Sequence, residues 1–142
     1  MGLAGWLSSV FNLPRHANTT VMIARGRGYT FNIVGESQFQ DVLAQIAGPK
    51  TPDGAKAERT AQIVDDDNEH DENAIAVLIG GKVVGFIPRA VAASMRADLA
   101  RINPAGHPIT CRAKITGGWR DADGHEGHYG VKLSISNPIR LE

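Results

Sequence analysis

Cysteine is almost absent from this sequence, and its scarcity limits the kinds of site that the chain can build. Cys111 is the only cysteine, so neither an internal disulfide nor a zinc site of several thiolates can form. It lies in an apolar stretch, where a buried and unreactive thiol is the usual state. We therefore expect no cysteine nucleophile, and a reducing, cytoplasmic location fits the single free thiol.

Long hydrophobic runs are also absent. No segment reaches the ~20 consecutive apolar residues of a transmembrane helix, so we expect no membrane partner. The N-terminal stretch MGLAGWLSSVFNLPRH is apolar but lacks the preceding basic residues and the cleavage site of a signal peptide. Trp6, Val10 and Phe11 suit one face of a short helix that Pro14 ends. Residues 1–30 are therefore predicted to form a helical or extended segment that packs on the domain or binds a partner.

An excess of charge of either sign is missing as well, because 15 basic residues balance 15 acidic ones. A neutral chain at first argues against a nucleic-acid partner, since such proteins usually carry a basic surface. The two signs are unevenly distributed, however. Residues 61–72 contain six acids and no Lys or Arg, whereas residues 73–140 contain nine bases and four acids. The second region can still present a local basic face.

Recognisable catalytic and metal-binding motifs are missing too. The chain has no nucleophile elbow and no phosphate-binding loop. A calcium loop that began at Asp65 would place His70 at the sixth position, where the EF-hand loop requires glycine. His125 and His128 form a His-x-x-His pair in a glycine-rich loop without further ligands, which favours a plain loop over a zinc site. We predict a protein that is not an enzyme and has no cofactor and no specific metal site.

The most unusual stretch is DDDNEHDENAIAVLI, from Asp65 to Ile79, which concentrates six carboxylates before an apolar strand. A metal site, a solvated turn and a polar clamp for a ligand would each account for it. The residues from Asn68 to Asn73 are of types that satisfy their own backbone and tolerate tight bends. A turn explains how the charge is tolerated, but it leaves open whether one carboxylate also binds a ligand.

The hydrophobic periodicity predicts a mainly β (α+β) chain. One helix is expected to start with Ser37 as its N-cap and to end at Gly48, and the main helix is expected from about Ala90 to Arg101. Strands are predicted at residues 29–34, 59–64, 74–79, 82–87, 108–116 and 129–136. Short strands separated by glycine turns are typical of a small closed or half-closed antiparallel barrel.

Four motifs, in this order, resemble the HIRAN domain family in its bacterial, freestanding form. They are Val34-Gly35-Glu36-Ser37-x-Phe39-Gln40, then Asp67-Asn68-x-x-Asp71-x-Asn73-Ala74-Ile75, then Gly80-x-Lys82-Val83-Val84-Gly85-Phe86-Ile87-Pro88-Arg89, and finally Ile115-x-Gly117-Gly118 with Tyr129-Gly130-Val131. The resemblance extends from Phe31 to Ile135, so residues 31–140 are predicted to be the domain. Residues 141–142 resemble the remnant of a cloning tag.

The resemblance implies a six-stranded antiparallel OB-like β-barrel with one or two packed helices. In eukaryotic members attached to helicases of replication-fork repair, the domain captures the 3′-hydroxyl end of single-stranded DNA. Transferred to this chain, the implied nucleic-acid-binding residues are Asp71 on the terminal hydroxyl, His70 beside it, Arg89 on a phosphate, Phe86 as a neighbouring contact, Tyr129 as a base-stacking ring and Phe39 as a nearby aromatic. A helicase or nuclease is the partner that the resemblance implies.

Three positions depart from the family pattern. Ser37 and Gln38 stand where eukaryotic members have arginine and tyrosine, and Pro88 replaces a further basic residue. Weaker or altered nucleic-acid binding is the expected consequence. The predicted function is a non-enzymatic module that binds single-stranded DNA, at its 3′ end, in DNA repair or processing. The alternative is a protein-interaction adaptor that docks a partner through its N-terminal helix.

Overall fold

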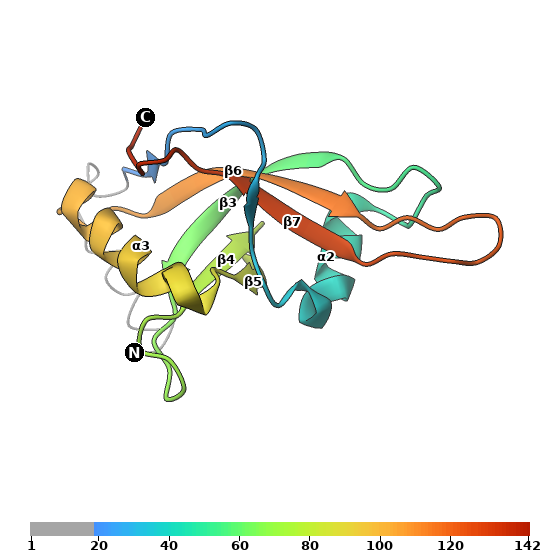
Figure 1. Ribbon diagram of the computed structural model, residues 1–142, viewed down its shortest axis with the longest axis horizontal. Helices are drawn as coiled ribbons and strands as arrows, with labels where there is room; N and C mark the ends of the chain where they lie inside the picture. The colour runs from blue at the N-terminus through green and yellow to red at the C-terminus, as the bar shows by residue number, and fades with distance from the viewer. Residues whose placement is uncertain (1–18) are drawn as a thin grey trace.

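The computed structural model describes residues 19–142, which form one strongly curled sheet with two helices (Figure 1). In chain order the elements are β1 Val21–Met22, β2 Phe31–Asn32, η2 Glu36–Phe39, α2 Gln40–Ala47, β3 Ala57–Asp65, β4 Ile75–Ile79, β5 Lys82–Phe86, α3 Arg89–Ile102, β6 Ile109–Gly117 and β7 Tyr129–Ser134. Here η2 is a single 3₁₀ turn. The prediction of a mainly β (α+β) fold is confirmed.

Six strands follow one another in the order β2-β7-β6-β3-β4-β5, and each pairs antiparallel with its neighbour. The two outer strands approach each other beyond the end of β2. There the backbone N–H groups of Val34 and Phe86 each donate to the other residue's carbonyl, at 2.9 and 2.8 Å. This single bridge joins the edges of the curled sheet, so the OB-like half-barrel that was expected is observed.

The meander β3–β4–β5 and the helix after it form as predicted. Gly80 and Gly81 both have positive φ, at 61° and 79°, which is the backbone of a two-residue hairpin turn. Helix α3 buries one stripe, consisting of Ala92, Met95 and Leu99, at the helical spacing of three and four residues. The predicted main helix is therefore confirmed, with an additional residue at each end.

The segment before the first long strand differs from the prediction. Ser37 is exposed and makes no capping hydrogen bond, so its prediction as an N-cap was wrong. Gly35, with φ of 84°, turns the chain into the 3₁₀ turn, and the α-helix begins only at Gln40. The segment is held instead by tertiary hydrogen bonds in which the side chains of Glu36 and Gln40 bond the backbone of β7, and sequence pattern does not reveal such bonds.

Residues 19–30 belong to the same structural unit. Val21 and Met22 pair parallel to Ile109 and Thr110 of β6, and Ile23 is completely buried in the core. The predicted domain boundary at residue 31 therefore lies too late in the chain. The boundary was placed where the family motifs begin, whereas the core also includes Ile23, which comes earlier in the chain. The predicted N-terminal helix with Trp6, Val10 and Phe11 lies outside the described residues.

The C-terminal residues pack against this early strand. Leu141 forms an antiparallel bridge with Ile23, and the Glu142 N–H donates to the Met22 carbonyl at 2.9 Å. Glu142 also pairs with Arg112 through its carboxylate, at 2.9 Å. Residues 141–142 thus take part in the fold, whatever their origin.

The interior of the curled sheet is a single apolar core. Its largest fully buried side chains include Leu43 from α2, Ile75 and Val77 from β4, and Leu133 from β7. Cys111 is completely buried there, and burial raises the pKa of its thiol to about 12, so the thiolate is not populated at neutral pH. In the part of the chain that the structure describes, no helix combines the length and apolarity needed to cross a membrane.

Candidate nucleic-acid interface

The acidic run forms a turn that satisfies most of its own backbone. The Asn68 side-chain oxygen accepts hydrogen bonds from the N–H groups of His70 and Asp71, both at 2.9 Å. One oxygen of Asp71 accepts from the Asn73 N–H, also at 2.9 Å. The side-chain oxygen of Asn68 and one of the two Asp71 carboxylate oxygens are therefore used in hydrogen bonds within the turn. The second oxygen of Asp71 remains available for another contact.

Arg96 of α3 holds the base of this turn. Its guanidinium donates to the Asp67 carboxylate and, at 2.7 Å, to the Ala74 carbonyl, and its Nε lies 3.5 Å from Asp65. Burial alone would lower the pKa of Arg96, but the hydrogen bond to Asp67 and the charges of the nearby aspartates raise it above its usual range. Arg96 therefore stays charged and neutralises the part of the run that lies next to the sheet. Sequence reasoning missed this residue because it is far from the run in the chain.

We expect Arg96→Met to lower the free energy of unfolding by about 1–3 kcal/mol, because a partly buried carbonyl loses its donor and Asp65 and Asp67 lose their counter-charge. Methionine keeps the aliphatic stem in place. Urea denaturation measures the change. Arg101→Met is the matched control, since Arg101 is 66% exposed on the same helix and its pair with Asp98 should contribute below about 1 kcal/mol. Equal losses in the two variants would show that the turn does not depend on Arg96.

Asp71, Arg89 and His70 form the polar part of the predicted site. The free oxygen of Asp71 lies 3.8 Å from Nε of Arg89, and Nη2 of Arg89 lies 3.4 Å from the His70 carbonyl. Only 20% of the Asp71 side chain is exposed, against 79% of Arg89. Arg89 is also the first residue of α3, whose N-terminus favours negative groups. A mostly buried carboxylate and an exposed guanidinium thus lie side by side at the molecular surface.

Phe39 and Phe86 form the aromatic part. Their ring centroids are 6.1 Å apart, with an angle of 55° between the ring planes, and both residues are partly exposed. Phe86 ends β5 and is the cross-strand partner of Ala76, which follows the acidic turn. Ile87 continues the contact by donating its N–H to the Ile75 carbonyl at 3.0 Å. The fold therefore brings Phe39 and Phe86 to the end of the β4–β5 pair at which the acidic turn and Arg89 also lie.

Tyr129 does not belong to this surface. Its side chain is in the core, with the residue only 3% exposed, and its hydroxyl donates to the Gly48 carbonyl at the end of α2. Its backbone N–H donates to the Gln40 side chain at 2.8 Å. The expectation that Tyr129 stacks on a base is therefore wrong for this conformation, because α2 and Gly118 occupy the space around the ring. A tyrosine after a glycine-rich loop fits either role, and packing decides between them.

A possible cation-binding group is found elsewhere, in the loop between β6 and β7. Asp121, Asp123 and His125 bring ligand atoms within 4.8 Å of one another, and all three residues are exposed. One oxygen of Asp121 already accepts from the N–H groups of the other two, at 3.0 and 2.9 Å. His128 is not part of the group. Turn hydrogen bonds therefore account for this arrangement without a metal.

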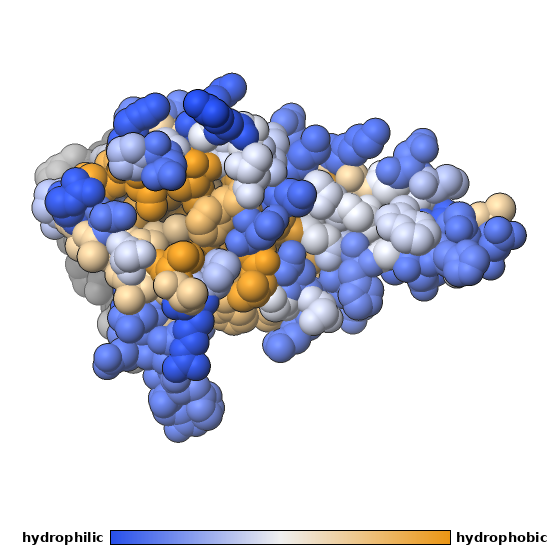
Figure 2. Space-filling model, viewed as in Figure 1, coloured by the Kyte–Doolittle hydropathy of each residue, from blue (hydrophilic) through white to orange (hydrophobic). Residues whose placement is uncertain are grey.

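An apolar groove lies apart from the candidate interface. It encloses about 300 Å³ between α3 and the segment after β7, and its lining includes Phe31, Val91, Met95, Ile135 and Ile139. Figure 2 shows apolar side chains gathered in the half of the molecule that carries α3, whereas the half with the long β6–β7 loop is pale or blue. The groove offers packing surface and only one carboxylate, that of Asp98.

A search of protein-family models, curated proteins and solved structures returns no match for this chain. The resemblance to the HIRAN domain therefore rests on the four sequence motifs. Of the six residues that it implicates, Phe39 pairs with Phe86, and His70 and Asp71 contact Arg89; both groups lie at the end of the β4–β5 pair that is opposite its hairpin turn.

Proposed function

We propose that the chain binds single-stranded DNA at its 3′-hydroxyl end, as a module without catalytic activity of its own. The observation that carries the proposal is that the Phe39–Phe86 ring pair and the Asp71–Arg89 pair lie at the same end of the β4–β5 pair. Each of these groups suits one part of a strand end. The HIRAN resemblance adds support, because its motifs name the same residues.

The chemistry of a strand end can be divided among these side chains. Partly exposed aromatic rings offer a surface on which a terminal base can stack. Arg89 can neutralise the nearest phosphate, and its exposed side chain is free to move toward it. The second oxygen of Asp71 accepts hydrogen bonds only, so it suits a terminal hydroxyl and repels a terminal phosphate. This division makes the end of the strand, rather than its interior, the preferred ligand.

The interface is smaller than the family pattern implies. Tyr129 is buried, and the exposed residues Ser37 and Gln38 supply neither a charge nor a ring. Pro88 supplies no charge next to Arg89. Binding should therefore be weak on its own and only shallowly dependent on salt, since few phosphates are neutralised. A helicase or nuclease partner would provide the additional affinity and any motor or cleavage activity in repair or processing.

The test compares short oligothymidylates that end in a 3′-hydroxyl or a 3′-phosphate, by fluorescence anisotropy. We expect the hydroxyl end to bind more than about tenfold tighter, because a charge-assisted hydrogen bond is replaced by repulsion between two anions. Asp71→Asn should reduce the difference in affinity between the hydroxyl end and the phosphate end. Asparagine keeps an oxygen for the Asn73 N–H, so the turn remains intact while an amide can donate to phosphate.

Arg89→Ala is the second variant in this binding test. It should weaken binding of both oligonucleotides and reduce the salt dependence by about one phosphate contact. Arg101→Ala, at the other end of α3, is the control and should leave both properties unchanged. Equal affinity of the wild-type protein for the two ends would refute end capture. Binding that Arg89→Ala leaves unchanged would refute this location.

A further inference from the structure

The outer face of β6 and β7 places positively charged side chains next to one another. Lys114 and Lys132 are direct cross-strand partners, and Glu58 of β3 neighbours Lys114 on the other side. Arg112 shares their face, because side chains two residues apart on a strand point the same way. Like charges that face each other across strands destabilise a sheet. An anion bound here would relieve that repulsion.

The loop before β2 crosses this face at very short range. The Gly26 N–H donates to the Ser134 hydroxyl at 3.0 Å. A Cβ on Gly26 would lie 2.3 Å from the Ile135 carbonyl oxygen, so only glycine allows this approach. The contact carries the neighbouring Arg25 and Tyr29 over β6 and β7. A pocket is thereby built from two segments that are distant in sequence.

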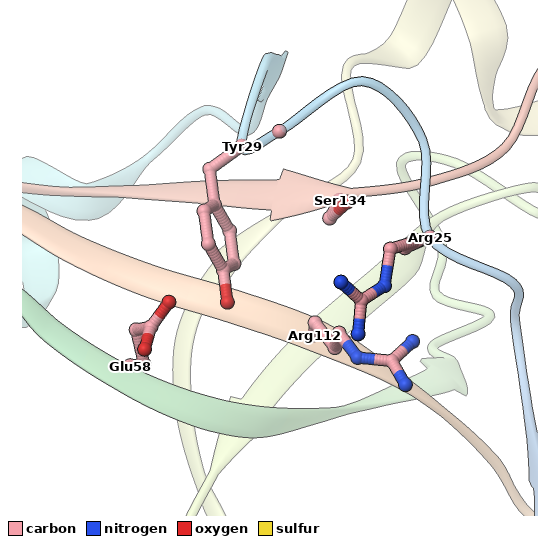
Figure 3. Close-up of a pocket in the computed structure, with 6 residues that line it drawn as sticks. Arg25, Tyr29, Glu58, Arg112 and Ser134 are labelled. Carbon is pink, nitrogen blue, oxygen red and sulfur yellow. The ribbon is translucent and has the colours of Figure 1, made fainter.

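The pocket encloses about 420 Å³ and is lined by polar groups. Figure 3 shows the Tyr29 hydroxyl between Glu58 on one side and the guanidinium groups of Arg25 and Arg112 on the other. Burial, followed by hydrogen bonding and charge from Glu58, raises the pKa of Tyr29, so the hydroxyl keeps its proton at neutral pH. Lys114 lies 5.8 Å from the centre of the Tyr29 ring.

Several of these cations have no partner within residues 19–142. Arg112 pairs with Glu142, at 2.9 Å. Arg25 and Lys132 make no hydrogen bond or ion pair with any described residue, and within the same residues Lys114 makes a cation–π contact with the Tyr29 ring and no ion pair. Glu58 and Glu142 offset the charges of Arg25 and Arg112, so the positive surplus around the pocket comes from the neighbouring Lys114 and Lys132.

We infer that this Tyr29 pocket is a second, separate binding site, and that it takes the phosphate of a nucleotide, either free or within a nucleic-acid strand. Arg25 can hold the phosphate as guanidinium groups do, through paired N–H donors, and the phosphate would compete with Glu142 for the Nη donors of Arg112. Glu58, across the Tyr29 hydroxyl, accepts a hydrogen bond from a hydroxyl or amino group of the same ligand. A volume of about 420 Å³ falls within the usual range of small-molecule sites.

The inference does not depend on end capture at Asp71. Two strands, β3 and β4, separate β6 from β5 in the sheet, so the two sites use different surfaces. A strand blocked by a 3′-phosphate lacks the hydroxyl that Asp71 would recognise, yet it still carries phosphates for the Tyr29 pocket. The same probe therefore distinguishes failure of one proposal from failure of the other.

The experiment is an amide NMR titration of the full chain with three probes, which are pyrophosphate, thymidine 5′-monophosphate and a 3′-phosphorylated oligothymidylate. We expect saturable shifts at Gly26, Gly28 and Tyr29. Arg25→Gln should weaken binding about tenfold, the effect of losing one charge-assisted contact. Arg27→Gln is the matched control, because Arg27 is an exposed neighbour that does not line the pocket. It should change affinity less than twofold.

Each outcome decides the inference. Saturation by the mononucleotide points to a free nucleotide, whereas saturation by the oligonucleotide alone points to a nucleic-acid strand, and both support the pocket. Equal weakening by Arg25→Gln and Arg27→Gln would show general attraction to a basic surface and overturn it. The absence of shifts in the pocket at millimolar concentrations of all three probes would overturn it as well.

Discussion

Replacing Tyr129 with alanine is expected to destabilise the protein by about 3–5 kcal/mol, the usual cost of removing a buried aromatic side chain. The ring lies in the core against Gly118, and its hydroxyl ties β7 to the end of α2 at Gly48. Alanine would leave a cavity that the surrounding sheet cannot close. Urea denaturation followed by circular dichroism measures the loss, and the melting temperature should fall by roughly 10 °C or more.

Tyr129→Phe separates the contribution of the hydroxyl to stability from that of the ring. It removes only the hydrogen bond to the Gly48 carbonyl, so we expect a loss of about 1 kcal/mol. Binding to DNA, expressed per folded molecule, should be the same for both variants and the wild type. If Tyr129→Ala instead retained full stability and lost affinity, the ring would be a stacking surface and its burial would have to be transient.

Gly118→Ala is expected to cost about 2–5 kcal/mol, from two separate causes. Gly118 has φ of 62°, a backbone conformation that costs a residue with a side chain about 1–2 kcal/mol. Its added Cβ would also lie 2.2 Å from a ring carbon of Tyr129, and overpacking of a core typically costs 1–3 kcal/mol. The ring cannot yield easily, because its hydroxyl is anchored to Gly48. The measurement is again the free energy of unfolding in urea.

Gly124→Ala isolates the backbone contribution. Gly124 has a comparable φ of 86°, but an added Cβ would meet no atom within 4 Å. We therefore expect a loss of only about 1–2 kcal/mol for this variant. The difference between the two glycine variants measures how tightly Tyr129 is packed. Equal losses would contradict the close contact between Gly118 and the ring.

The sequence by itself determined the elements whose residues act locally. Apolar residues at helical spacing, among them Met95 and Leu99, predict α3 because helical periodicity alone places these side chains on one face. The strands on both sides of Gly80-Gly81 follow from their apolar runs and from a turn that glycine favours. Short antiparallel strands in this order leave few folds other than a small curled sheet.

Tertiary structure decided the roles of residues whose chemistry fits more than one place. Tyr129 suits a core and a binding surface equally well, and only the docking of α2 over it assigns it to the core. From the sequence, Arg96 is one polar residue among several on a predicted helix. Only the packing of α3 beside the acidic turn assigns it to holding that turn. Arg25 and Tyr29 meet Arg112 because the Gly26 loop crosses β7. Such contacts join segments that are distant in the chain, and local sequence patterns carry no information about which distant segments will meet.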